Sequence, residues 1–189
     1  ANGFTNKARK QAQSNVSSLR EAIVGKGIPV LATSSTCTFT LRDEYPHVLD
    51  VDNSDLREHI ELATRFLWRK LDNGQTLPLK PLPLKVVYHT PCHMEKMGWS
   101  IYTLELLRLI PGLELTVLDS RCCGIAGTYG FKSENYPTSQ AIGAPLFRQI
   151  EESGADIVVT DCETCKWQIE MSTSKRCEHP ISLLAKALG

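Results

Sequence analysis

Five cysteines in the second half of the chain have the residue type and the grouping of a metal site. They fall into three clusters: Cys92 alone, the adjacent pair Cys122 and Cys123, and the pair Cys162 and Cys165. Each cluster comes soon after a short apolar run that is typical of a β-strand. Thiolates are soft ligands, favoured by iron–sulfur clusters and by zinc. The grouping therefore predicts a metal centre rather than core packing.

The number of thiols and the adjacent pair favour iron and sulfur over a single ion. A structural zinc is saturated by four ligands, which leaves one of the five cysteines over. The side chains of Cys122 and Cys123 diverge in extended backbone, so they reach one small ion poorly but can bind different irons of a cluster. Zinc bound by four of the five thiols, or by three thiols with His89 or His93, stays open as an alternative.

The pair Cys162 and Cys165 also fits a third kind of chemistry. Two cysteines separated by two residues occur in dithiol redox motifs as well as in metal sites. At a turn that enters a helix, free backbone amides stabilise a thiolate in either role. A thiol–disulfide module that uses this pair is therefore a further alternative. The two cysteines outside the clusters, Cys37 and Cys177, are expected to be small buried residues.

Three expected strands place the cysteine clusters at one edge of a sheet. The apolar runs 85–89, 113–118 and 157–160 alternate with helical periodicities, which indicates an α/β fold with parallel strands and right-handed crossovers. Ligands of open α/β sheets bind beyond the carboxyl ends of the strands. One site at that edge can therefore collect cysteines that lie 73 positions apart along the chain.

The first part of the chain shows a similar alternation of elements. Apolar spacing predicts a helix over 5–24, a short buried strand over 28–33 and a helical stretch from Ser34 that Pro46 stops. A long amphipathic helix is expected over 54–72.

The two halves repeat each other at a nearly constant offset. Apolar helix positions match at 127 residues, and after one inserted residue Cys37 matches Cys165 at 128. An ordered set of matches in helix, strand and cysteine favours a duplication. Ser34 stands where the second copy has Cys162, so the first copy keeps one cysteine of the pair.

These patterns predict two tandem related α/β units with short parallel sheets flanked by helices. A partial first repeat is expected over 1–75, truncated at its N-terminus, and a complete second repeat over 85–189. Three prolines exclude helix interior and central strand from the segment between them, so 76–84 is expected to be a linker.

Composition limits the classes of partner. The 21 lysines and arginines balance the 21 aspartates and glutamates, so no overall field points to nucleic acid. No apolar run is long enough to span a bilayer. Seven cysteines are an odd number, which argues against a fully paired disulfide framework and favours reduced thiols with a metal or redox task.

The cysteine pattern resembles that of the CCG family of cysteine-rich domains. The family signature is a lone cysteine, then Cys-Cys-Gly, then Cys-x-x-Cys, here carried by Cys92, Cys122-Cys123-Gly124 and Cys162-Glu163-Thr164-Cys165. One of the subunits of heterodisulfide reductase carries two such copies, which agrees with the repeat. The resemblance implies that all five cysteines are ligands of a non-cubane [4Fe–4S] cluster or, in some members, of zinc. Because Ser34 interrupts the first copy, a second cluster of this kind is not expected.

Longer runs around these cysteines, 88–99, 122–130 and 160–167, resemble the iron–sulfur subunits of complexes that oxidise glycerol 3-phosphate. The resemblance implies an electron-transfer subunit without catalytic residues, which passes electrons from flavoprotein dehydrogenase subunits toward menaquinone in anaerobic respiration. It also implies a peripheral place on the cytoplasmic face of the bacterial inner membrane. A structural zinc domain that serves subunit docking is the alternative from another functional class.

Overall fold

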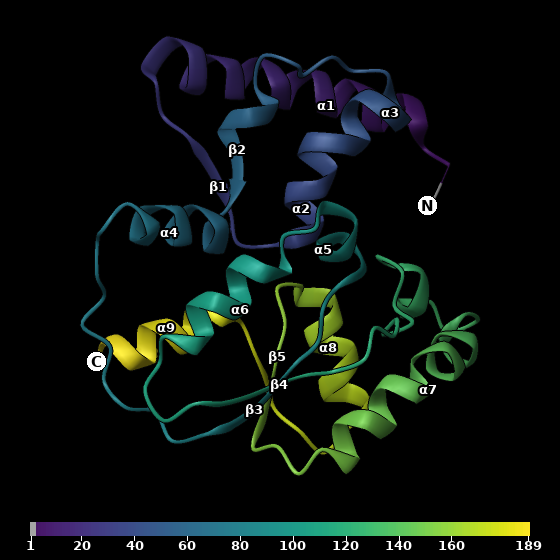
Figure 1. The fold of residues 1–189 in the computed structure, drawn as a ribbon. Helices are drawn as coiled ribbons and strands as arrows, with labels where there is room; N and C mark the ends of the chain where they lie inside the picture. The colour runs from purple at the N-terminus through teal and green to yellow at the C-terminus, as the bar shows by residue number, and fades with distance from the viewer. Residues whose placement is uncertain (1–2) are drawn as a thin grey trace.

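The computed structural model describes residues 3–189 and shows an α/β protein with two parallel sheets (Figure 1). The smaller sheet pairs β1 (Val30–Ala32) with β2 (Ile60–Leu62). The larger sheet has the strand order β4-β3-β5-β6, and its strands are β3 (Lys85–Tyr88), β4 (Glu114–Val117), β5 (Ile157–Val159) and β6 (Cys177–Glu178). Each of these pairings is parallel, which confirms the predicted fold class.

Helices cover both faces of the larger sheet. α6 and α9 lie on one face, and α7 and α8 lie on the other (Figure 1). The larger sheet and its helices, residues 85–189, form the second lobe. Its helical elements are α5 (Cys92–Met97), α6 (Ser100–Arg108), a 3₁₀ turn (Tyr129–Phe131), α7 (Tyr136–Glu152), α8 (Glu163–Ser172) and α9 (Pro180–Leu188).

Alternation along the strands explains the two layers of core. Successive side chains of a strand point to opposite faces, so Val86 and Tyr88 pack with the α6 and α9 side, whereas Val87 packs with the α7 and α8 side. All three are at most 2% exposed. Burying an apolar side chain of this size stabilises the fold by about 1.5–3 kcal/mol. β3 is therefore held from both faces at the centre of the sheet.

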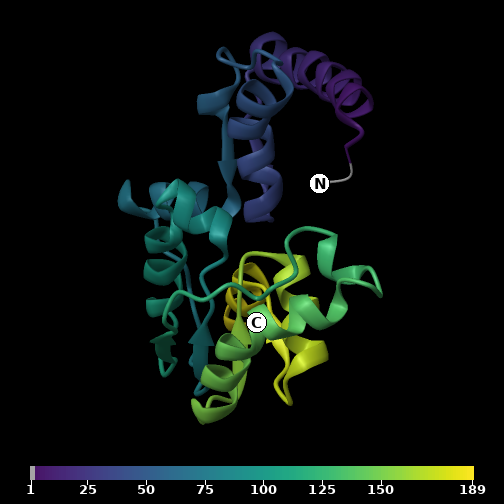
Figure 2. The same ribbon diagram turned by 90° about the vertical axis from the view of Figure 1, so that its right-hand side faces the viewer.

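The part of the chain from residue 3 to residue 75 forms the first lobe, which lies above the larger sheet in Figures 1 and 2. Its helices pack around a core that includes Val16, Tyr45, Leu56 and Ile60. The elements of this part of the chain are α1 (Thr5–Arg20), a π-helical turn (Glu21–Gly25), α2 (Ser35–Phe39), a second π-helical turn (Thr40–Glu44), α3 (Tyr45–Leu49), a 3₁₀ turn (Arg57–His59) and α4 (Ala63–Asp72).

Three expectations for this lobe are wrong. The predicted long helix over 54–72 is divided. Residues 60–62 form β2 beside β1, and the α-helix α4 begins only at Ala63. Pro46 does not stop the preceding helix: it lies at the start of α3, where its missing N–H costs little. The strand over 28–33 is not fully buried, since Leu31 is 42% exposed.

The proline-rich segment has no regular structure and lies against the second lobe. Its backbone is held by bonds from Lys80 N to Ala187 O (2.6 Å) and from Leu82 N to Pro111 O (2.8 Å). α4, which belongs to the predicted first repeat, packs on α6 and α9. The division into 1–75, 76–84 and 85–189 stays a prediction, and its residues 1–2 lie outside the described part of the chain.

Candidate metal centre

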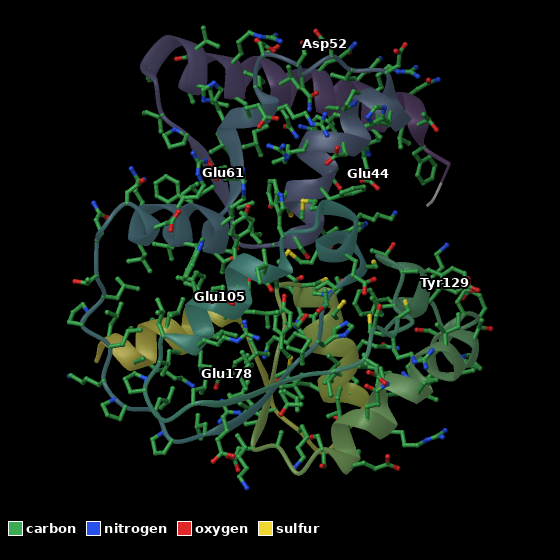
Figure 3. The ribbon with its side chains drawn as sticks, in the orientation of Figure 1. Glu44, Asp52, Glu61, Glu105, Tyr129 and Glu178 are labelled. Atoms are coloured by element: carbon green, nitrogen blue, oxygen red, sulfur yellow. The ribbon has the colours of Figure 1, made fainter. Side chains whose placement is uncertain are left out.

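The carboxyl ends of three neighbouring strands carry the five candidate ligands. β3 leads through His89 to Cys92 at the start of α5, and β5 leads to Cys162 just before α8. β4 is followed by the loop that holds Cys122 and Cys123. Since β3 pairs with both β4 and β5, the three loops meet at one edge of the sheet. Figure 3 shows sulfur atoms, drawn in yellow, gathered where α5, α8 and the loop before α7 approach one another.

The buried part of the cluster is formed by three cysteines. The Sγ atoms of Cys123 and Cys165 are 3.3 Å apart, and these residues are 3% and 5% exposed. Cys162 is also buried, and its sulfur interacts with Cys165. Cys92 and Cys122 are exposed free thiols that line a cavity of about 70 Å³ together with Cys123 and Cys165. The structure therefore brings the five predicted residues together, two at the rim and three below it.

His89 is the histidine that the structure adds to this group. It is 2% exposed, and its ligand nitrogen and the sulfurs of Cys123 and Cys165 all lie within 4.8 Å of one another. Its Nε2 has no hydrogen-bond partner among the described residues. A buried histidine with one ring nitrogen beside two sulfurs fits a metal ligand or a donor to a metal-bound thiolate.

His93, the other histidine considered from the sequence, makes its contacts with α2 of the first lobe. Its ring stacks on Phe39 with the centroids 4.8 Å apart, and its Nδ1 lies 3.1 Å from the hydroxyl of Thr36. Burial lowers the pKa of His93, which favours the neutral ring. These contacts favour packing over metal binding for His93.

Hydrogen bonds among the thiols concentrate negative charge on two of them. The Cys165 thiol, with help from Thr164 and Thr36, lowers the pKa of Cys162 to about 5. Hydrogen bonding with Cys122 and Cys165 holds the pKa of Cys123 well below its usual range, while the pKa values of Cys122 and Cys165 are raised. The thiolate is the form that binds metal. The donor set therefore fits a soft metal group.

The two remaining cysteines differ from each other. Burial raises the pKa of Cys177 to about 12, so it is an inert thiol of the core, as expected. Cys37 is exposed, which contradicts the expectation of a buried residue. It lies on α2, which begins immediately after the smaller sheet and faces solvent at this position.

Gly124 of the Cys-Cys-Gly run has a structural requirement. Its φ is +85°, and a Cβ at this position would collide with the carbonyl oxygen of Ser139 on α7. The Ser139 hydroxyl in turn donates to Gly124 O at 2.9 Å, and Gln168 Nε2 donates to the same hydroxyl at 2.9 Å. α7 and α8 thus fix the loop that carries Cys123. Neither Ser139 nor Gln168 was a candidate from the sequence, since each lies outside the cysteine clusters.

Asp161, just before Cys162, is a fully buried carboxyl. Tyr88 OH donates to it at 2.5 Å, and the Thr103 hydroxyl donates to its other oxygen at 3.1 Å. Burial raises the pKa of Asp161 to about 6. Its backbone carbonyl accepts a bond from Ser35 N at 2.9 Å, so α2 of the first lobe is attached to the chain beside the site.

A larger cavity of about 510 Å³ adjoins the site through Cys162. It touches none of the other four candidate ligands; its polar walls include Thr160, Lys166 and His179.

In the part of the chain that the structure describes, no helix is long and apolar enough to cross a membrane.

Comparison with known proteins supports the resemblance. Residues 86–170, which contain all five candidate ligands, match the family model of the cysteine-rich domain CCG. The chain is 86% identical over its 189 residues to one of the subunits of the anaerobic glycerol-3-phosphate dehydrogenase of Escherichia coli K12, and it spans 48% of the length of that relative.

Two more distant relatives share a lower identity with the chain. One of the subunits of the dihydromethanophenazine:CoB–CoM heterodisulfide reductase of Methanosarcina barkeri is 27% identical over 96% of this chain and 45% of its own length. An uncharacterized iron–sulfur protein of Methanocaldococcus jannaschii is 36% identical over 52% of this chain and 20% of its own length. The chain thus spans about half the length, or less, of these curated relatives.

Proposed function

Residues 86–170 are a cysteine-rich domain of the CCG family, and on that premise we propose that the chain is part of an iron–sulfur electron-transfer subunit. The proposed ligands are Cys92, Cys122, Cys123, Cys162 and Cys165. The single observation that carries the proposal is the convergence of these thiols from three neighbouring loops. The 86% identity to a dehydrogenase subunit supports it.

The protein's own contribution is to hold and shield the group. A bound iron–sulfur cluster supplies one-electron oxidation and reduction. The buried cysteines and His89 exclude water from the inner side of the site, whereas Cys92 and Cys122 lie at the surface, where a partner can approach. Gly124 and Ser139 keep the loop of the adjacent cysteines in place. Five cysteine ligands would suit a non-cubane [4Fe–4S] cluster, because adjacent cysteines can bind different irons.

The wider role follows from the relative in Escherichia coli. That relative is named as part of an anaerobic glycerol-3-phosphate dehydrogenase, which supports electron flow from flavoprotein subunits that oxidise glycerol 3-phosphate. We extend this to menaquinone as the acceptor and to peripheral attachment at the cytoplasmic face of the inner membrane. We also retain the division into a partial repeat over 1–75 and a complete repeat over 85–189, because β1 and β5 are each followed by a turn into a helix.

Metal and sulfide analysis of anaerobically purified protein tests the cluster. The proposal expects a brown protein that contains iron and acid-labile sulfide in similar amounts. A colourless protein with one zinc would contradict it and favour a structural zinc site. The compact group of His89, Cys123 and Cys165 is the observation that supports zinc, since mixed histidine and cysteine sets are common zinc ligands.

The partner proposal has its own experiment. Flavoprotein subunits should co-purify with the intact protein, and glycerol 3-phosphate should reduce a water-soluble menaquinone analogue only when both parts are present. The same complex made with Cys165→Ser should bind glycerol 3-phosphate and fail to reduce the quinone. Equal quinone reduction by the variant would remove this chain from the electron path.

A further inference from the structure

Two threonine hydroxyls lie within hydrogen-bond distance of the Cys162 sulfur. Thr164, on the same turn, has its Oγ1 at 3.3 Å from Cys162 Sγ. Thr36, on α2 of the first lobe, has its Oγ1 at 3.6 Å from the same sulfur. The two threonines are 128 residues apart, so they correspond to each other in the repeat that relates Cys37 to Cys165. The first lobe has no cysteine at Ser34, yet it supplies a polar group to the site of the second lobe.

The donor and acceptor roles follow from the chemistry of a ligand thiolate. A deprotonated sulfur has no proton to give, so it can only accept. A hydrogen bond between Thr36 and this thiolate then requires the single O–H of Thr36 to donate to Cys162. The Thr36 oxygen is left as an acceptor, and His93 Nδ1, 3.1 Å away, donates to it in the tautomer that carries the proton on this nitrogen. His93, Thr36 and Cys162 therefore form a chain of hydrogen bonds in one direction.

This chain is held in place from both ends. The His93 ring is half-buried and stacked on Phe39, which lies on the same helix as Thr36. The helix is fixed to the second lobe by the bond from Ser35 N to Asp161 O, one residue before Cys162. The Thr36 hydroxyl is thus positioned by two contacts that do not involve the sulfur.

We propose that Thr36 is a positioning residue that donates a hydrogen bond from the first lobe to Cys162 and thereby raises the reduction potential of the metal group. The inference rests on the proposed iron–sulfur function. Reduction adds negative charge to the group, and a hydrogen bond to a ligand sulfur stabilises that charge. The first lobe therefore acts on the redox site without contributing a ligand.

A potentiometric titration of the full-length protein, followed by its electron paramagnetic resonance signal, tests the inference. The signal of this site is identified as the one that Cys162→Ser removes or changes. Thr36→Val should lower its midpoint potential, and Thr36→Ser should restore it because the hydroxyl returns. A net hydrogen bond corresponds to about a three- to tenfold change in the reduction equilibrium, or roughly 30–60 mV for one electron.

Two further variants extend the test. One removes the second hydroxyl near the Cys162 sulfur, and the other makes the same substitution away from the site. Thr164→Val should lower the potential by a similar amount, since its hydroxyl is as close to the sulfur. Thr116→Val, on the exposed surface of β4, makes the same chemical change away from the site and should leave the potential unchanged. Comparable thermal unfolding of all variants separates loss of the hydrogen bond from loss of structure.

The outcomes distinguish the inference from the function on which it rests. An unchanged potential in Thr36→Val, or an equal fall in Thr36→Val and Thr36→Ser, would overturn the role of the hydroxyl while the iron content stays intact. Wild-type protein without iron and sulfide would instead overturn the proposed function itself.

Discussion

The turn after β1 and the turn after β5 are built alike, yet only one belongs to the candidate metal site. Both enter a helix, α2 or α8, and both carry a cysteine at the same place, Cys37 or Cys165. Cys165 is 5% exposed and lies 3.3 Å from Cys123, whereas Cys37 faces solvent. The difference lies in the neighbours: β5 has β3 beside it with its cysteine loop, while β1 is paired with β2 among the described residues. A turn becomes part of the candidate metal site through the strands next to it.

The largest expected effect comes from replacing one of the two equivalent cysteines, Cys165 or Cys37, by serine. Cys165→Ser should lose most of the bound iron and sulfide, because its sulfur contacts both Cys123 and Cys162. Cys37→Ser is the matched control and should retain them. Iron and sulfide analysis after anaerobic purification measures both. Equal loss in the two variants would remove the distinction between the two turns.

The Cys-Cys-Gly loop offers the next test, since the first lobe has no described counterpart. Gly124→Ala should lower the free energy of unfolding by about 3 kcal/mol or more, because strain at positive φ adds to the collision with Ser139. Gly127→Ala also has positive φ, +68°, but meets open space, so about 1–2 kcal/mol is expected. Urea unfolding of the metal-free proteins measures the difference, and equal losses would contradict the assigned collision.

The buried carboxyl beside Cys162 should make stability depend on pH. Burial raises the pKa of Asp161 from 3.8 to about 6, so the folded state favours the protonated form. The stabilisation of the folded state that comes from this raised pKa is fully present below about pH 4 and is lost as the pH rises through 6. The two-unit shift corresponds to about 3 kcal/mol.

Asp161→Asn removes this titration and should flatten the dependence. Urea unfolding of metal-free wild-type and variant protein between pH 4 and pH 7 measures it. The difference between the free energies of unfolding of the wild-type protein and of Asp161→Asn should change between pH 4 and pH 7. A constant difference would show that Asp161 does not titrate in this pH range. The first lobe offers the opposite case, since a hydrogen bond from Arg20 lowers the pKa of the Asp55 carboxyl.

The smallest effect is expected in the first lobe, at the ion pair of Arg20 and Asp55. Their side chains are 43% and 40% exposed, so salt screens the attraction. Asp55→Asn should leave iron content, midpoint potential and the urea midpoint at high salt unchanged. A lower iron content in this variant would show that the first lobe supports the site more broadly than through α2.

Local patterns predicted the larger sheet well and the first lobe less well. Apolar runs bounded by glycine and proline predicted β3, β4 and β5, and the clusters after them form the candidate site. The spacing over 54–72 fits a helix, but residues 60–62 pair with β1, because tertiary pairing outweighs helical periodicity in a short segment. The two-residue strand β6 is too short to leave a pattern.

The sequence by itself determined the types of the candidate ligands, their spacing, the α/β class and the place of the cysteines after successive strands. Only the tertiary structure decided which groups surround each sulfur. It brought His89 rather than His93 to Cys123 and Cys165, placed Ser139 and Gln168 behind the Cys-Cys-Gly loop, and set Thr36 against Cys162 from a distant helix. The physical reason is that ligand identity is local chemistry, whereas hydrogen-bond partners depend on how helices pack across the edge of the sheet.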